Sequence, residues 1–233
     1  MGFAYKPVRF DDLNAINTIN PISDIKTSYD EIAHILVQTL PQGLILLDGF
    51  PTANISTFLD HVCRAKPGIT TIDVSRFYRS AEEIQELLKP YLPQDRDIDP
   101  ELIFGKLFDQ GFQPFFDLEK VSLFLNSLVD GQTVILYGLG SACALFRPLS
   151  EAILYIDVTP KDAALRVYDG LYQCLGNLKE QDFDTVIRQT YFIDVELAVH
   201  LRKELIQNDH IDFYFLDSEH SFSMLSNGAL QEI

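Results

Sequence analysis

The chain has 233 residues, of which 47% are hydrophobic and 22% are charged, a balance typical of a globular domain with a full apolar core. Its net charge of −16 repels phosphate backbones and anionic lipids, so neither nucleic acid nor a membrane surface is expected as a partner. Three widely separated cysteines argue against a disulfide framework. The N-terminus lacks a signal-peptide pattern, and no apolar run approaches about 20 residues, so we expect a cytoplasmic protein.

In chain order, residues 1–25 have a mixed composition that predicts an irregular N-terminal arm. Segments typical of parallel strands follow near 44–47, 70–74, 133–137, 152–158 and 212–216, and the first of them is wholly apolar, as in a strand covered on both faces. Helical periodicity separates them. The expected helix starts are two capping boxes, Ser28 with Glu31 and Ser80 with Glu83, and N-caps at Asp99, Asp117 and Thr159, with a last helix near 195–206. The pattern predicts a single α/β domain over 1–233, with a three-layer, mainly parallel sheet and helices on both faces.

The turn after the first strand has the setting of a phosphate-binding loop. Segment 44–58, LILLDGFPTANISTF, places a glycine-bearing turn between a strand and a helix. Aligning the pattern G-x-x-x-x-G-K-[ST] from Gly49 puts Asn54 at the second glycine, Ile55 at the lysine and Ser56 at the hydroxyl, with Thr57 as a spare hydroxyl. The phosphate-gripping lysine is therefore absent, although the first N–H groups of the helix could still hold an anion weakly. The alternative is a plain strand–turn–helix unit.

Acidic residues lie at or near the carboxyl ends of three expected strands, where ligands of parallel sheets bind. Asp48, Asp73 and Asp157 could line one cleft there and hold Mg²⁺ or a sugar hydroxyl. The alternative is that these acids only end strands and cap helices. Gly138, directly after the third strand, is a further candidate at the same edge.

Basic residues near these strand ends are candidates for binding a phosphate. Arg76, Arg79 and Arg166 carry the planar donors that suit phosphate, and the alternative is that they form ion pairs with the many acids. The five histidines show no metal-ligand spacing, so neither a metal site nor a cofactor is expected.

Three segments resemble the uridine-kinase branch of P-loop kinases. Residues 72–79, IDVSRFYR, look like that family's D-S-F-Y segment, and residues 113–117, QPFFD, are similar to its H-P-x-A-F-D. Residues 152–170 resemble its late strand and helix, including Arg166. The resemblance implies a P-loop-kinase-like fold in which the acid of D-S-F-Y polarises the substrate hydroxyl, and Ser75 stands at that position here. With Ile55 in place of the lysine as well, a degenerate domain without phosphoryl transfer is expected.

A resemblance that covers most of the chain is to the extra N-terminal domain of long bacterial class I mannose-6-phosphate isomerase-like proteins. It rests on residues 5–8, 47–51, 137–141, 154–159 and 191–194. It implies an accessory domain in sugar-phosphate metabolism, with the isomerase chemistry in a separate zinc-binding cupin region. The expected partners are a phosphorylated small molecule or a cupin isomerase domain. Two alternatives stay open: an active nucleoside or sugar kinase with an unusual site at the same strand ends, and a purely structural docking domain for a zinc cupin isomerase.

Overall fold

A computed structural model describes residues 26–176, 181–219 and 221–226, so the expected N-terminal arm at 1–25 lies outside the described residues. Its centre is a six-stranded sheet in the order β2-β3-β1-β4-β5-β6. The strands are β1 (Gly43–Gly49), β2 (Thr70–Asp73), β3 (Thr133–Tyr137), β4 (Ser150–Val158), β5 (Phe213–Ser218) and β6 (Ser221–Ser226). Strands β1 to β5 pair in parallel and β6 pairs antiparallel to β5. All five expected strands are present, and the mainly parallel α/β sheet is confirmed.

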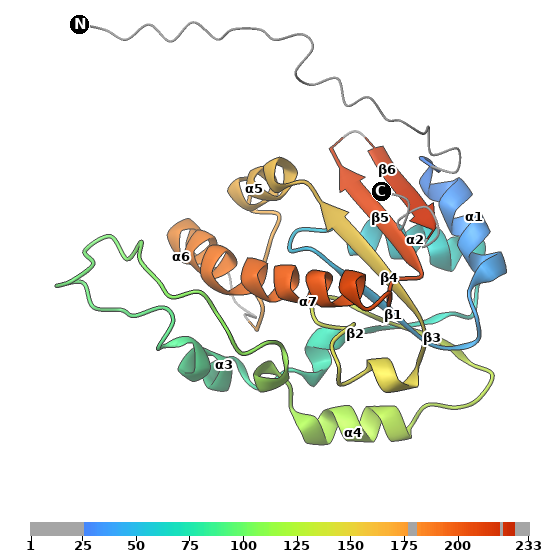
Figure 1. Ribbon diagram of the computed structural model, residues 1–233, viewed down its shortest axis with the longest axis horizontal. Helices are drawn as coiled ribbons and strands as arrows, with labels where there is room; N and C mark the ends of the chain where they lie inside the picture. The colour runs from blue at the N-terminus through green and yellow to red at the C-terminus, as the bar shows by residue number, and fades with distance from the viewer. Residues whose placement is uncertain (1–25, 177–180, 220, 227–233) are drawn as a thin grey trace, which may run out of the picture.

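Helices cover both faces of this sheet, which gives the expected three layers (Figure 1). Ile45 and Leu47 of β1 belong to the core under α1 (Tyr29–Thr39) and α2 (Ile55–Ala65). Leu44 and Leu46 belong to the core under α3 (Ala81–Leu88), α4 (Leu118–Asn126) and α7 (Val195–Gln207). Successive strand residues point to opposite faces, so a strand covered on both sides must be apolar throughout. This explains the continuous apolar run from which β1 was predicted.

The helix starts follow the sequence in most places. The capping box of Ser80 with Glu83 forms at α3, and the side chains of Asp117 and Thr159 cap α4 and α5 (Pro160–Tyr168). Ser28 precedes α1 as predicted, but its side chain makes no capping hydrogen bond, so that capping box is wrong.

The helix expected from Asp99 is also wrong. The Asp99 carboxylate accepts the N–H groups of Ile103 at 3.1 Å and Phe104 at 2.8 Å, four and five residues on, whereas a helix cap accepts those two or three residues on. Leu102, directly before Ile103, has a φ of +52°, in the left-handed region, and a helix cannot continue through this conformation.

Two further elements were not predicted. Strand β6 was missed because its polar–apolar alternation is short. Its buried Phe222 and Met224 belong to the core under α1 and α2. Helix α6 (Phe183–Gln189) runs through a π-helical turn, Thr190–Asp194, directly into α7. Such turns widen a helix locally and often occur at functional sites. Within the described residues, no helix combines the length and the apolar character needed to cross a bilayer.

Candidate functional site

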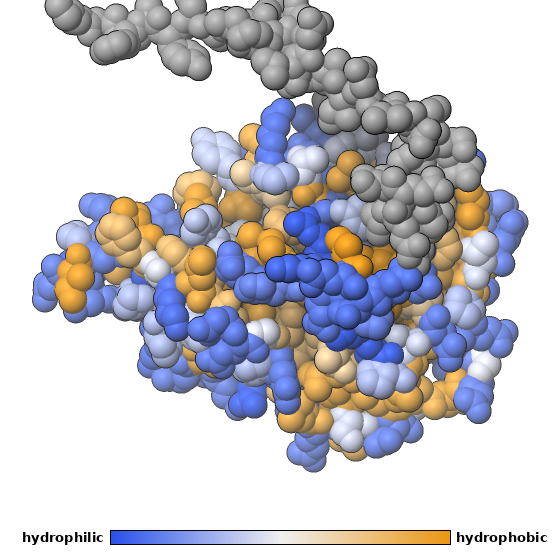
Figure 2. Space-filling model, viewed as in Figure 1, coloured by the Kyte–Doolittle hydropathy of each residue, from blue (hydrophilic) through white to orange (hydrophobic). Residues whose placement is uncertain are grey.

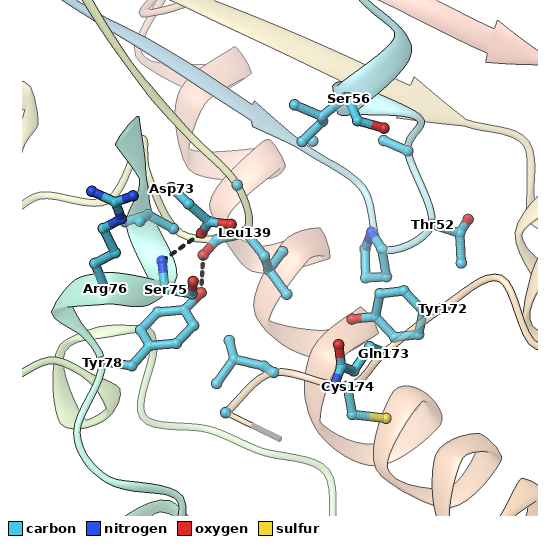
Figure 3. A pocket seen from close by; sticks show the side chains of 18 of the residues that line it. Thr52, Ser56, Asp73, Ser75, Arg76, Tyr78, Leu139, Tyr172, Gln173 and Cys174 are labelled. Carbon is cyan, nitrogen blue, oxygen red and sulfur yellow. Dashed lines mark hydrogen bonds between the residues drawn. The ribbon is translucent and has the colours of Figure 1, made fainter. Parts of the chain in front are cut away.

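A cavity of about 900 Å³ opens at the carboxyl ends of β1, β2 and β3. Its walls are the loop after β1, the turn after β2, the turn after β3 and the segment 171–176 that follows α5 (Figure 3). From β1 the chain crosses to β2 on one side, whereas from the neighbouring β3 it crosses to β4 on the other side, so the connections run in opposite directions here. Open α/β sheets bind ligands at such a point, and the volume suits a small molecule.

Most of the predicted site residues line this cavity. These are Gly49, Asn54, Ser56, Asp73, Ser75, Arg76, Gly138 and Arg166. The other three, Asp48, Thr57 and Asp157, do not line it.

Several backbone N–H groups of the loop after β1 already donate hydrogen bonds to acceptors within the chain. The N–H of Gly49 donates to the Asp48 side chain at 2.8 Å, and the N–H of Phe50 donates to the carbonyl of Ile156 at 2.8 Å. The N–H of Asn54 donates to Oδ2 of Asp217 at 2.9 Å. The Asn54 side chain then caps α2 by accepting the N–H of Thr57 at 3.4 Å. A phosphate loop needs such groups free to point at the ligand. In the turn 49–54, the N–H groups of Gly49, Phe50 and Asn54 are therefore already engaged by the chain's own acceptors.

An ion pair between Arg166 of α5 and Asp217 of β5 holds the loop after β1 in place. Arg166 donates to both carboxylate oxygens of Asp217, at 2.6 Å and 2.9 Å, and also to the carbonyl of Thr52 at 2.9 Å. The side chains of Arg166 and Asp217 are only 18% and 4% exposed. Asp217 thus supplies the negative charge that a phosphate would bring to the start of α2. For Arg166 the ion-pair alternative holds. Asp217 itself was missed, because nothing near it in the sequence indicates its partners.

The three strand-end acids do not converge on one cleft, so that expectation is wrong. Asp48 is fully buried and accepts the N–H groups of Gly140 at 3.2 Å and Ala142 at 2.8 Å. Burial raises the pKa of Asp48 to about 7, against the lowering effect of these hydrogen bonds. Asp157 is paired with Arg202 at 2.6 Å and also accepts the hydroxyl of Tyr214. Only Asp73 lines the cavity, and its carboxylate accepts the N–H of Ser75 at 2.8 Å.

Three basic side chains form one wall of the cavity, called the cationic wall below: Arg76, Arg79 and Lys120. All three are exposed. Arg79 and Lys120 are steadied by the carbonyls of Phe116 and Tyr78, at 3.3 Å and 3.1 Å. Lys120 was missed, although its place three residues after the cap Asp117 brings it to the start of α4 beside the turn after β2.

The acids beside the cationic wall are held by helix caps. The Glu83 carboxylate binds the hydroxyl and the N–H of Ser80, and these hydrogen bonds lower the pKa of Glu83. The N–H of Lys120 likewise lowers the pKa of Asp117. Both groups are therefore fixed as carboxylates at the helix starts. Among the residues that the structure describes, no group of three or more His, Cys, Asp or Glu side chains could hold a metal ion.

Comparison with solved structures finds similarity in fold to a putative fructose transport system kinase from Silicibacter sp. TM1040, at 14% sequence identity and a TM-score of 0.49. The similarity covers 76% of this chain and 95% of that chain. No curated protein matches the chain. A family model described as a domain of unknown function, DUF8485, matches residues 28–233. Because this match spans most of the sequence, the chain belongs to the DUF8485 family.

Proposed function

We propose that this chain is a degenerate kinase-like accessory domain that binds a phosphorylated small molecule in the cavity and does not transfer its phosphate. The observation that carries the proposal is the cationic wall, which places Arg76, Arg79 and Lys120 at one cavity in a chain with a net charge of −16. Arginine donors match phosphate oxygens in geometry as well as in charge. The neighbouring carboxylates of Glu83 and Asp117 cap helices, and Oδ2 of Asp117 also pairs with Nζ of Lys120 at 3.6 Å, so Arg76 and Arg79 are the groups expected to face the ligand.

Three features oppose phosphoryl transfer. Ile55 stands in the lysine position and packs against the core under α1 and α2. Ser75 stands in the position of the catalytic acid. The Asp217 carboxylate takes the N–H of Asn54, which is therefore not free to bind a nucleotide phosphate at the start of α2. Phosphoryl transfer depends mostly on positioning and on stabilising negative charge, and a factor of ten in rate corresponds to about 1.4 kcal/mol. Losing both catalytic groups therefore removes several powers of ten in rate.

The resemblance to long mannose-6-phosphate isomerase-like proteins supports a role in sugar-phosphate metabolism and suggests a phosphate ester as the ligand. The test is calorimetric titration of the chain with inorganic phosphate, mannose-6-phosphate and ATP at low salt. Arg76→Gln and Arg79→Gln should each weaken binding of a phosphate ester about tenfold to a hundredfold, because a hydrogen bond to a charged group contributes about 1.5–3 kcal/mol.

Arg64→Gln is the matched control, since Arg64 is exposed on α2 and does not line the cavity. The proposal requires binding that the cavity variants weaken and Arg64→Gln leaves unchanged. ATP-dependent phosphorylation of a sugar or nucleoside that Ser56→Ala abolishes would show an active kinase instead.

A second candidate is docking to a zinc cupin isomerase domain. Phe183 and Ile187 lie four residues apart on one face of α6 and are 44% and 42% exposed. Figure 2 shows apolar side chains among the polar ones at the left of the view, where α6 lies in Figure 1. Sedimentation of the chain mixed with a class I mannose-6-phosphate isomerase tests this candidate, and a complex that is lost in Ile187→Asp would support it.

A further inference from the structure

The cavity has an aromatic side opposite its cationic wall. Segment 171–176 follows α5 and lines the cavity with Tyr172. In Figure 3, Tyr172 lies with Thr52 on one side of the cavity, whereas Asp73, Ser75 and Arg76 lie on the other. The lining of the cavity also includes the apolar Pro51, Leu171 and Leu175, and the polar Gln173 lies beside Tyr172 (Figure 3). The two sides therefore offer different chemistry to the two ends of one ligand.

The side chain of Tyr172 is held in place by contacts with the protein interior. Its hydroxyl donates to Oδ2 of Asp194 at 2.8 Å, and the N–H of Leu175 donates to the same oxygen at 3.1 Å. Asp194 is fully buried and comes from the π-helical turn between α6 and α7. The Tyr172 ring also packs against the small apolar cluster of Val167, Cys174 and Val186. These contacts fix the ring before any ligand arrives, which removes most of the entropy cost of ordering it.

We propose that Tyr172 is a stacking platform for a flat, unsaturated ring on the ligand, while the phosphate of that ligand lies at the cationic wall. The inference rests on the proposed function and adds the ligand class, an aromatic or heteroaromatic phosphate ester. A tyrosine face favours a flat π-system over a saturated ring of the same size, because stacked rings gain contact and electrostatic complementarity. The cavity volume of about 900 Å³ admits a molecule with both ends.

Three esters of equal charge isolate the contribution of the ring: methyl phosphate, cyclohexyl phosphate and phenyl phosphate. Phenyl phosphate should bind about fivefold to a hundredfold more tightly than methyl phosphate, the range expected for stacking of one ring on an aromatic side chain. Cyclohexyl phosphate, which has the same size without the π-system, should gain clearly less. Adenosine monophosphate and mannose-6-phosphate then distinguish an aromatic from a saturated natural ring, and the inference requires the first to bind more tightly.

Substitutions locate the effect. Tyr172→Leu should remove the preference for phenyl phosphate and leave the affinity for methyl phosphate unchanged. Tyr172→Phe keeps the ring and should keep most of the preference. Tyr168→Leu is the control, because Tyr168 is 71% exposed and does not line the cavity. Arg76→Gln should weaken all three esters by the same factor.

The outcomes separate this inference from the proposed function. Equal binding of phenyl, cyclohexyl and methyl phosphate to the wild-type chain would overturn the stacking platform and leave the phosphate site standing. Binding of none of the esters would overturn both. The comparison of the three esters needs only the wild-type chain, so the inference is tested even where Tyr172→Leu fails to fold.

Discussion

Asp217→Ala is expected to destabilise the chain strongly, because three hydrogen bonds converge on one buried carboxylate. The substitution removes the two bonds from Arg166, at 2.6 Å and 2.9 Å, and the acceptor of the Asn54 N–H at 2.9 Å. It also leaves the Arg166 guanidinium, 18% exposed, without its counter-charge. The loop after β1 loses its tie to β5.

The magnitude follows from this burial. Removing one partner of a buried ion pair costs about 3–5 kcal/mol, because the other charge stays buried and unpaired. Arg166 keeps its bond to the Thr52 carbonyl and has some contact with solvent, so we expect about 3 kcal/mol, the lower end of the range. Arg166→Ala should cost a similar amount, because it leaves Asp217, only 4% exposed, as the unpaired charge.

The assay is urea denaturation followed by circular dichroism, for the wild type, both single variants and the double variant. The double variant should cost less than the sum of the two single variants, by about 1–3 kcal/mol, since it leaves no unpaired buried charge. Asp217→Asn, which keeps an acceptor for the Asn54 N–H, should fall between Asp217→Ala and the wild type.

Glu86→Gln is the control, because Glu86 and Lys89 form an exposed pair and the unfolding midpoint should not move. An Asp217→Ala variant as stable as Glu86→Gln would refute the reasoning, since the ion pair would then not hold the loop closed. Strictly additive single variants would contradict the direct pairing of Arg166 with Asp217.

Two further predictions concern stability. Burial raises the pKa of Asp48 to about 7 and that of Asp194 to about 6, so between about pH 4 and 7 the folded chain holds protons that the unfolded chain has released. The free energy of unfolding should therefore fall as the pH rises through this window, and urea midpoints that stay level or rise from pH 5 to 7.5 would contradict it. Gly140→Ala should destabilise the chain more than Gly68→Ala: both glycines have positive φ, +85° and +100°, but only at Gly140 would the added Cβ lie 2.5 Å from Phe112. Melting temperatures measure the difference, and equal losses would mean that Phe112 can move aside.

The strands and most helix starts could be predicted because their causes are local. Residues 44–47 are all apolar, and a strand covered on both faces requires this. Ser80 and Glu83 are three residues apart, the spacing at which a helix start satisfies its own N–H groups. The location of the candidate site could be predicted from the same pattern, since parallel strands bring their carboxyl ends together at one edge of the sheet.

Which side chains meet at that edge was decided by the tertiary structure alone. Arg166 and Asp217 are 51 residues apart and Tyr172 and Asp194 are 22 apart, so no spacing rule relates them. Asp48 sits at the end of a strand as predicted, yet the turn after β3 folds over its carboxylate and removes it from the cavity. Residues 44–58 predict a loop with the outline of a phosphate site. Only the packing of β5 and α5 against that loop shows that the Asn54 N–H is already bonded to Asp217, because a buried N–H or guanidinium takes the nearest available acceptor.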